Sequence, residues 1–380
     1  MFKNYLVIAT RSFLQQKLFS FINVIGLAVG LTSCILMLLF VRYETSYDDW
    51  MPDADRIFKV NTSIEPNPGD ITYFGKVRNL IKTAFDFEFE EIEASTRLRT
   101  FGPRLAVADH LINEDLWFAD RNLFDVFDLD LVDGPKDYKV TGIFKDLPNN
   151  SELIAEFIVP LAEDSKDSPA TYLFLKLKPN ANVTTISSRL SDFATRNQAG
   201  TNTKYSLINL RDIHLYSGQH AGHGIKPAGD ITVVSSFAVS AIIILALAII
   251  NFVNLSLARS FRRVKEVIVR KTAGASRSQL IRQFFIENIV TTVVAMLIAL
   301  VFVEMTMPFY SAFLGYTLTL EYLSDPVIIP AVVGMSVIVG IVASSYPALY
   351  LSSLKPAQIL NAGGSTINSS NAGFRSFMIF

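Results

Sequence analysis

Three long stretches of this chain contain no charged residue. They cover residues 18–41, 231–258 and 326–354 and contain 24, 28 and 29 residues. Each is longer than the roughly 20 residues that an α-helix needs to cross the hydrocarbon core of a bilayer. A fourth apolar stretch, residues 284–307, is interrupted only by two glutamates near its ends, where side chains reach the membrane interfaces. The pattern predicts four transmembrane helices.

The residues between the first two apolar stretches have a different pattern. Short apolar and alternating runs, bounded by Pro, Gly and Asp, predict strands at 57–60, 95–100, 138–144, 157–160 and 172–177. Helical spacing of apolar residues predicts helices at 75–85, 123–127 and 183–196. The predicted fold class is therefore an α-helical membrane protein with four transmembrane helices and an α+β extracytoplasmic domain inserted between spans 1 and 2.

The amino-terminal residues 1–17 allow more than one interpretation. Apolar side chains at helical spacing, with charged ones elsewhere on the wheel, predict an amphipathic helix on the inner leaflet. The alternative is that these residues extend the first span. A lipoprotein signal cleaved before Cys34 is a further alternative. It is disfavoured because the apolar run continues to Val41, where a mature lipoprotein turns polar.

Charge is segregated along the chain although the formal net charge is only −1. Residues 1–17, 259–282 and 351–380 together carry 13 Lys and Arg and one acid, Glu266, whereas residues 42–230 carry 21 basic and 30 acidic residues. The positive-inside rule therefore predicts a cytoplasmic amino terminus and a large domain outside. Cys34 is the single cysteine, so the chain contains no intramolecular disulfide.

Motifs for catalysis or nucleotide binding are missing from the sequence. It contains no GxxxxGK[ST] phosphate loop, no GxSxG elbow and no HExxH helix, so we expect no enzyme activity and no ATP bound by this chain. His214, His220 and His223 lie in a Gly-rich stretch and could hold a metal. No Cys or acid stands beside them at ligand spacing, so solvated loop histidines are favoured.

Four small or polar residues stand out within the predicted spans. Gly26 and Gly30 have the small-xxx-small spacing that allows close helix packing. Asn251 and Asn254 lie on one helix face, where an amide needs a partner if it is inside the membrane. The alternative is that the two amides reach the interface and are hydrated.

The stretch Asn251–Glu287, which we call the connector, joins the second and third predicted spans. It reads NFVNLSLARSFRRVKEVIVRKTAGASRSQLIRQFFIE and carries eight basic residues and one acid between Arg259 and Arg282. This run, the opening NYLVIATRSFLQQKLFSFINVIGLAVGL and the final SYPALYLSSLKPAQIL resemble FtsX-like and MacB-like permeases. YETSYDDWMPDADRIFKV and YKVTGIFKDLPNNSEL resemble landmarks of the MacB-like periplasmic core domain. These families form the mechanotransmissive class of ABC transporters, and the likeness is strongest to their large Bacteroidetes-type members.

The resemblance implies that the connector contains a coupling helix that docks on a separate ATPase subunit, where ATP binds. The residues at the corresponding motif positions are Arg263, Glu266, Arg270, Lys271, Gly274, Ala275 and Glu287. Gly274 and Ala275 would turn the chain toward the third span. The other partners implied are a second permease copy or repeat, membrane lipid and a periplasmic protein, with no cofactor in this chain and no nucleic acid.

The predicted organisation follows from the spans and the resemblance. It comprises an interfacial helix at 1–17, TM1 at 18–41, the periplasmic core domain at 42–230, TM2 at 231–258, the cytoplasmic coupling helix at 259–283, TM3 at 284–308, an outer loop at 309–325, TM4 at 326–350 and a cytoplasmic tail at 351–380. The resemblance places the chain in the bacterial inner membrane.

The sequence departs from the family pattern at three places. Ile268 stands where relatives usually have glycine, Glu152 stands where they usually have histidine, and the passage at 134–138 is shortened. The terminal FRSFMIF resembles the opening of a second repeat, so we expect half of a larger permease or a trimmed form. The implied function is transmission of ATP-driven motion to the periplasmic domain, for efflux, lipoprotein handling or antimicrobial-peptide resistance. The alternative is a non-transporting sensor or scaffold that binds a ligand or activates a cell-wall hydrolase.

Overall fold

The computed structural model describes residues 17–353, apart from 102–104, 108–109, 113–115, 130, 133–142, 145, 154–156, 162–169, 198–201, 221–224, 263 and 319–324. The chain divides into a helical unit, Met1–Phe40 with Ser236–Phe380, and an inserted domain, Val41–Ser235. The predicted interfacial helix before Lys17, the shortened passage at 134–138 and the tail after Ser353 lie outside the described residues.

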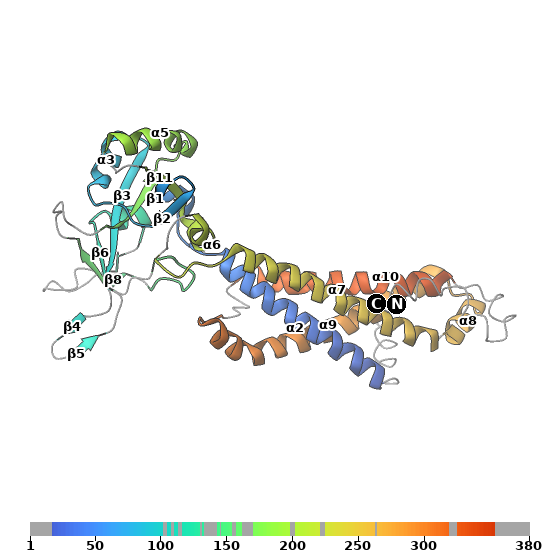
Figure 1. Ribbon diagram of the computed structural model, residues 1–380. Helices are drawn as coiled ribbons and strands as arrows, with labels where there is room; N and C mark the ends of the chain where they lie inside the picture. The colour runs from blue at the N-terminus through green and yellow to red at the C-terminus, as the bar shows by residue number, and fades with distance from the viewer. Residues whose placement is uncertain are drawn as a thin grey trace. The chain divides into compact units, whose positions relative to one another are not determined.

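The helical unit is built from long apolar helices (Figure 1). Its elements are α2 (Lys17–Thr45), α7 (Ile231–Arg262), α8 (Val264–Thr272), α9 (Arg277–Leu314) and α10 (Ile328–Ser353). All of them except α8 are long and apolar enough to cross a membrane. At 1.5 Å per residue the 38 residues of α9 extend roughly 57 Å, well beyond a hydrocarbon core of about 30 Å.

Small residues allow α2 and α7 to approach closely. A Cβ built on Gly30 would lie 2.4 Å from the Cβ of Ala248, a distance that real side chains do not adopt. One turn earlier, a Cβ on Gly26 would lie 3.2 Å from the Asn251 side-chain nitrogen. The two glycines therefore face α7 within the same chain.

α9 packs against its neighbours through both polar and apolar contacts. The Thr32 hydroxyl on α2 is within 3.3 Å of the Ala299 carbonyl oxygen, in addition to its bond to the Ala28 carbonyl at 2.8 Å. On the other side, Gly340 of α10 lies against Ile289, whose Cγ1 would be 3.1 Å from an added Cβ. These contacts make α9 a shared packing surface for α2 and α10.

The inserted domain contains a mixed seven-stranded sheet. Its strands lie in the order β11, β1, β10, β3, β6, β9, with β2 paired to β1, and only β6 and β9 run parallel. The sheet strands are β1 (Ile57–Asn67), β2 (Asp70–Phe74), β3 (Ile92–Phe101), β6 (Leu116–Ala119), β9 (Phe157–Pro160), β10 (Tyr172–Leu177) and β11 (Thr203–Asn209). Two short hairpins are β4 (Leu105–Val107) with β5 (His110–Ile112), and β7 (Leu131–Val132) with β8 (Ile143–Phe144).

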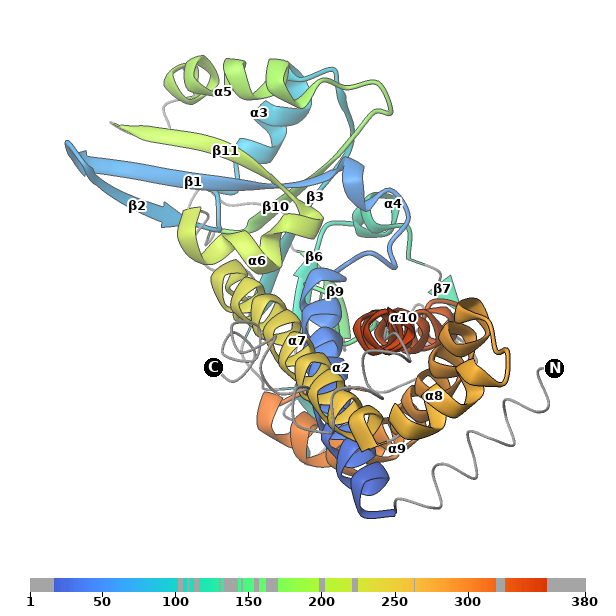
Figure 2. The same ribbon diagram turned by 90° about the vertical axis from the view of Figure 1, so that its right-hand side faces the viewer.

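Helices cover both faces of this sheet (Figure 2). They are α3 (Ile81–Glu88), α4 (Leu123–Phe127), α5 (Val183–Arg196) and α6 (Leu210–His220), with a 3₁₀ turn η1 (Ala54–Arg56) before β1. One core contains α3 and α5, where Phe85 and Phe193 have ring centroids 4.4 Å apart. The other core contains α4 and α6, where Phe127 packs edge-on against Phe174.

The predicted fold class, four membrane helices with an α+β domain between the first and second, is confirmed. The prediction of a helix at 75–85 is wrong at its start, because α3 begins at Ile81. Val77 instead exchanges both backbone hydrogen bonds with Thr171, at 2.8 and 2.9 Å. Of the strand predicted at 138–144, the described part is Ile143–Phe144.

A glycine-to-alanine substitution tests the packing of α2 on α7. We expect Gly30→Ala to destabilise the full chain by about 1–3 kcal/mol, because the methyl group would force the helices apart. Gly334→Ala in α10 is the matched control, since nothing lies within 4 Å of its added Cβ. Thermal unfolding in detergent should show a lower midpoint for Gly30→Ala and an equal or higher midpoint for Gly334→Ala. Equal midpoints for wild type and Gly30→Ala would contradict the contact.

Candidate functional site

The connector folds back on itself as a helical hairpin. Val267 of α8 is buried together with Leu280 and Phe284 of α9, and Ile268 packs against this cluster. Leu280 and Phe284 lie at i, i+4 on one face of α9, and the buried Val267 of α8 packs on that face. Ile268, which stands where relatives usually have glycine, therefore contributes to the inner packing of the hairpin.

The turn between α8 and α9 is closed by backbone and side-chain caps. Gly274 has φ +93°, a left-handed conformation that glycine adopts without a steric penalty. The Ala275 N–H donates to the Arg270 carbonyl at 3.0 Å, which satisfies a carbonyl at the end of α8. Ser276 and Gln279 then form a reciprocal capping box at the start of α9. These caps fix where α8 ends and where α9 begins.

A hydrogen bond with a charged donor joins α8 to α9 near the turn. Arg270 Nη1 donates to Oε1 of the buried Gln283 at 2.6 Å. Lys271, the next residue, has a lowered pKa because burial disfavours its charged form and the Arg277 guanidinium adds repulsion. Arg270 is thus directed back toward α9, and the sequence analysis did not single out its partner Gln283.

The side of α8 that faces away from α9 presents an exposed apolar side chain. Val269 is 66% exposed, and Ala273 and Gly274 beside it are also exposed. Between residues 264 and 282 the hairpin carries the basic residues Lys265, Arg270, Lys271, Arg277 and Arg282, and Glu266 is the single acid in that range of the sequence. An exposed valine within a basic stretch of sequence is suited to docking on an acidic partner that has an apolar recess.

The other predicted connector residues lie at different places. Arg263 is outside the described residues, and the side chain of Glu266 on α8 is not described. Glu287 lies on α9 one turn after Gln283 and is half-buried. The structure therefore brings Arg270, Gly274 and Ala275 together at the turn and leaves Glu287 farther along α9.

Polar groups also lie within the spans. Asn251 faces Gly26 and is exposed in the single chain, whereas Asn254 is half-buried. A pair that the sequence analysis missed is closer to the centre of the bundle: the Ser256 hydroxyl donates to Oδ1 of buried Asn288 at 3.3 Å, linking α7 to α9. The sequence feature that could have indicated this pair is Asn288, an amide side chain inside an apolar run, as are Asn251 and Asn254.

The predicted histidine cluster is described at one position only. His214 on α6 is buried, and its Nε2 lies 2.8 Å from a carboxylate oxygen of Glu44. The prediction of three solvated loop histidines is therefore wrong at His214, because the α6 helix turns that side chain into the domain. His223 and the side chain of His220 lie outside what the structure describes.

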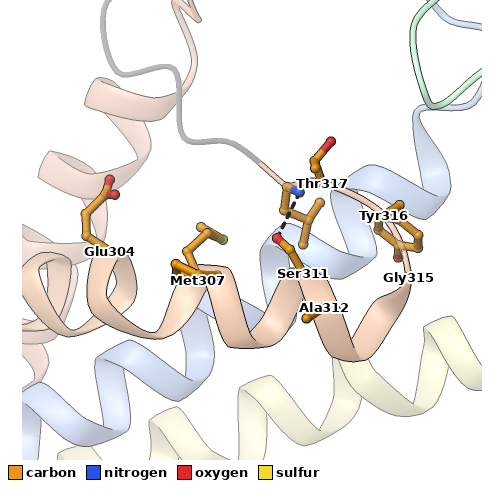
Figure 3. A pocket seen from close by; sticks show the side chains of 9 residues that line it. Glu304, Met307, Ser311, Ala312, Gly315, Tyr316 and Thr317 are labelled. Carbon is orange, nitrogen blue, oxygen red and sulfur yellow. Dashed lines mark hydrogen bonds between the residues drawn. The ribbon is translucent and has the colours of Figure 1, made fainter.

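A groove of about 790 Å³ lies beside the carboxyl-terminal end of α9 (Figure 3). Glu304, Met307 and Ser311 line one side of the helix there, and the chain after Gly315 folds back so that the Leu318 N–H donates to Ser311 Oγ at 3.1 Å. Pro308, Ala312, Tyr316 and Thr317 complete its lining. All of these residues belong to 304–318, so the groove is a feature of one helix end.

Comparison with known proteins identifies relatives of the membrane part. Residues 238–356 match the family model described as FtsX-like permease C-terminal. A stretch of 161 residues is 26% identical to the uncharacterized ABC transporter permease YknZ of Bacillus subtilis (strain 168), and it covers 42% of this chain and 37% of that protein. The matched region thus spans well under half of the relative's length.

Among solved structures, a crystallised domain of a protein described as a permease from Porphyromonas gingivalis is similar at 19% identity. The alignment covers 42% of this chain and 91% of that domain, with a TM-score of 0.35, which is too low to establish a common fold. The family match is independent of this structure. The match covers the connector, most of α7 and the spans α9 and α10, so this part of the chain is similar to FtsX-like permeases.

Proposed function

We propose that this chain is the permease subunit of an ABC transporter of the FtsX type and that its connector docks on a separate ATPase subunit. The observation that carries the proposal is the α8–α9 hairpin, which presents exposed Val269 within a basic stretch of sequence and is held by a buried apolar cluster between the two helices. A docking element of this kind transmits force only if it is stiff, and the turn caps and the Arg270–Gln283 bond supply that stiffness.

The direction of transmission follows from the chain topology. α7 leads directly from the connector to the inserted domain, and α2 leads into the same domain from the amino-terminal side. In the proposed orientation the connector is cytoplasmic, because the segments 1–17, 259–282 and 351–380 are basic and the inserted domain is acidic. ATP-driven closure of the ATPase would move α7 and α2, and the inserted domain would act on a substrate or partner outside.

A second copy of the permease is part of the proposal. Within the single chain, only 11% of the most apolar stretch of α7 is buried. Its exposed side chains include Ile242, Ile243, Leu247 and Ile250, which suit either lipid or another helix. Two permease units per ATPase pair would cover part of this surface.

Co-purification separates this function from that of a non-transporting sensor or scaffold. The full chain, extracted in mild detergent from the cells that naturally produce it, should retain a nucleotide-binding subunit, and addition of the chain should stimulate that subunit's ATPase activity. Reproducible purification without any nucleotide-binding subunit would favour the sensor or scaffold.

Substitution of Val269 tests the docking surface. We expect Val269→Asp to reduce stimulation of the ATPase at least tenfold, because a carboxylate would have to be desolvated in an apolar recess opposite an acidic rim. Val269→Ile is the matched control and should retain stimulation, because it keeps the side chain apolar. Membrane insertion and thermal unfolding should be unchanged in both variants, since the side chain is largely exposed. Full stimulation by Val269→Asp would exclude α8 as the docking element.

The Arg270–Gln283 bond is expected to act as an internal brace of the hairpin. Arg270→Met should cost about 1.5–3 kcal/mol of local stability, the usual worth of a hydrogen bond to a charged group. Gln283→Leu should cost a similar amount, and the double variant should cost little more than either single one, because both remove the same bond. Amide exchange of residues 264–283 measures this loss. Additive losses in the double variant would mean that the two side chains act separately.

A further inference from the structure

The end of α2 and the segment that precedes α7 contribute to one buried polar cluster inside the inserted domain. We call this set the root cluster; its members are Glu44, Tyr47, Asp48, Lys59, Glu152, His214 and Lys226. Every member except Lys226 is buried, and Lys226 is half-buried. The connector hairpin is in the helical unit, so the root cluster is a separate feature of the chain.

Asp48 ties the turn after α2 to a loop of the domain. Its Oδ1 accepts from the Ser151 hydroxyl at 2.6 Å and from the Glu152 N–H at 3.0 Å. Its own N–H donates to the Asn150 carbonyl at 2.9 Å. Asp48 is fully buried and adopts φ +58°, so this geometry depends on the loop that it holds.

His214 and Glu44 hold the segment that precedes α7. His214 Nε2 lies 2.8 Å from Glu44 Oε2, and the Tyr47 ring stacks on the imidazole with centroids 3.4 Å apart. A Cβ on Gly229 would lie 2.7 Å from His214 Nε2 and 2.8 Å from Glu44 Oε2. The backbone two residues before α7 is therefore pressed against a pair formed by α2 and α6.

Glu152 and Lys226 complete the connection between the two helix ends. The Ile225 N–H donates to Glu152 Oε1, and Lys226 Nζ donates to the Asn149 carbonyl at 2.7 Å. Lys59 on β1 is fully buried, and its Nζ has no hydrogen-bond partner among the described residues. The loop of residues 149–153 therefore contacts both the turn after α2 and the segment before α7. The loop also contributes the buried carboxyl group of Glu152.

We propose that the root cluster is a proton-sensitive joint: when Asp48 and Glu152 carry protons, the ends of α2 and α7 are held tightly in the inserted domain, and loss of these protons loosens the hold. Glu44 pairs with His214, whereas Asp48 and Glu152 are enclosed almost completely and no lysine side chain hydrogen-bonds to either carboxyl group among the described contacts, so ionising these two acids places negative charge in a buried site. The regulatory part of the inference rests on the proposed function, since only a transmitted motion can be regulated at this joint.

The direction of the pKa shifts agrees with this geometry. Burial raises the pKa of Asp48 to about 6 and that of Glu152 to about 7, although hydrogen bonds from Ser151 and Ile225 oppose the shifts. Burial lowers the pKa of Lys59 to about 8. The ionisable groups that face the two acids are Tyr47 from the turn after α2, Lys59 from β1, Tyr172 from β10, His214 from α6 and Lys226 before α7. Glu44 of α2 pairs with His214.

The pH window follows from the sign of each shift. Both acids have a higher pKa in the folded domain than in the unfolded chain, so their stabilising effect is complete below about pH 4 and is lost as the pH rises to about 7. Lys59 acts oppositely, because its pKa is lowered and stability returns only above about pH 8. The joint should therefore be weakest between about pH 7 and 8.

Amide hydrogen exchange of the full chain in lipid nanodiscs tests the joint without any ATPase. Peptides covering 44–51, 149–153 and 225–229 should lose about tenfold in protection between pH 5.5 and 7.5, after correction for the intrinsic exchange rate. Glu152→Gln keeps an acceptor for the Ile225 N–H but cannot ionise, so it should reduce the pH dependence of protection, and Asp48→Asn should do the same. The double variant, in which neither acid can ionise, should have equal protection at both pH values.

Glu93→Gln is the matched control, because Glu93 is an exposed acid paired with Arg56 on the same domain. It should show the same loss of protection as wild type. Equal wild-type protection at both pH values would overturn the proposal, as would an undiminished pH dependence in the double variant Glu152→Gln/Asp48→Asn.

A second measurement adds the co-purified ATPase and compares exchange with and without ATP. The ATP-dependent change in the inserted domain should be larger at pH 5.5 than at 7.5 in wild type and equal at the two pH values in the double variant Glu152→Gln/Asp48→Asn. If ATP causes no change at any pH while the joint still titrates, the proposed function fails and the joint stands. If the ATP-dependent change in wild type is the same at both pH values, the regulatory role is overturned.

Discussion

The inserted domain is joined to the helical unit by the chain at two points only, the end of α2 and the start of α7. Both helices continue across the boundary between the two units, so any covalently transmitted movement passes through these two helix ends. A helix can carry such movement because each turn is closed by its own backbone hydrogen bonds. The side chains at the two ends therefore decide how firmly the domain follows the helices.

The connector and the root cluster are built from different kinds of interaction. At the connector, apolar packing of Val267 against Leu280 and Phe284 gives stiffness, and exposed Val269 gives a contact surface. At the other end the interactions are mainly polar, with Asp48 and Glu44 fully enclosed. Apolar packing does not change with pH, whereas the interactions of a buried carboxyl group do. The packing of the connector is therefore insensitive to pH, and the root cluster responds to it.

Much of the membrane part could be predicted from sequence, because uncharged runs of this length are typical of transmembrane helices. The connector turn was also foreseeable from Gly274 and Ala275. The partner of Arg270 was not, because Gln283 contacts it only once the turn has closed. In the inserted domain, Val77 was assigned to a helix since its pairing with Thr171 depends on a residue far away in the sequence. Nothing local marked Asp48, Glu152 and His214 as neighbours, since they come from three separate segments, the turn after α2, the loop 149–153 and α6.

The contact between Gly30 and Ala248 has a consequence for how this sequence can evolve. With an added Cβ at residue 30 only 2.4 Å from that of Ala248, neither position has spare volume. A larger residue at 30 becomes acceptable only after 248 has become glycine, and a larger residue at 248 requires that 30 remain glycine. The histories of α2 and α7 are therefore linked at this crossing, although 217 positions separate the two residues in the sequence.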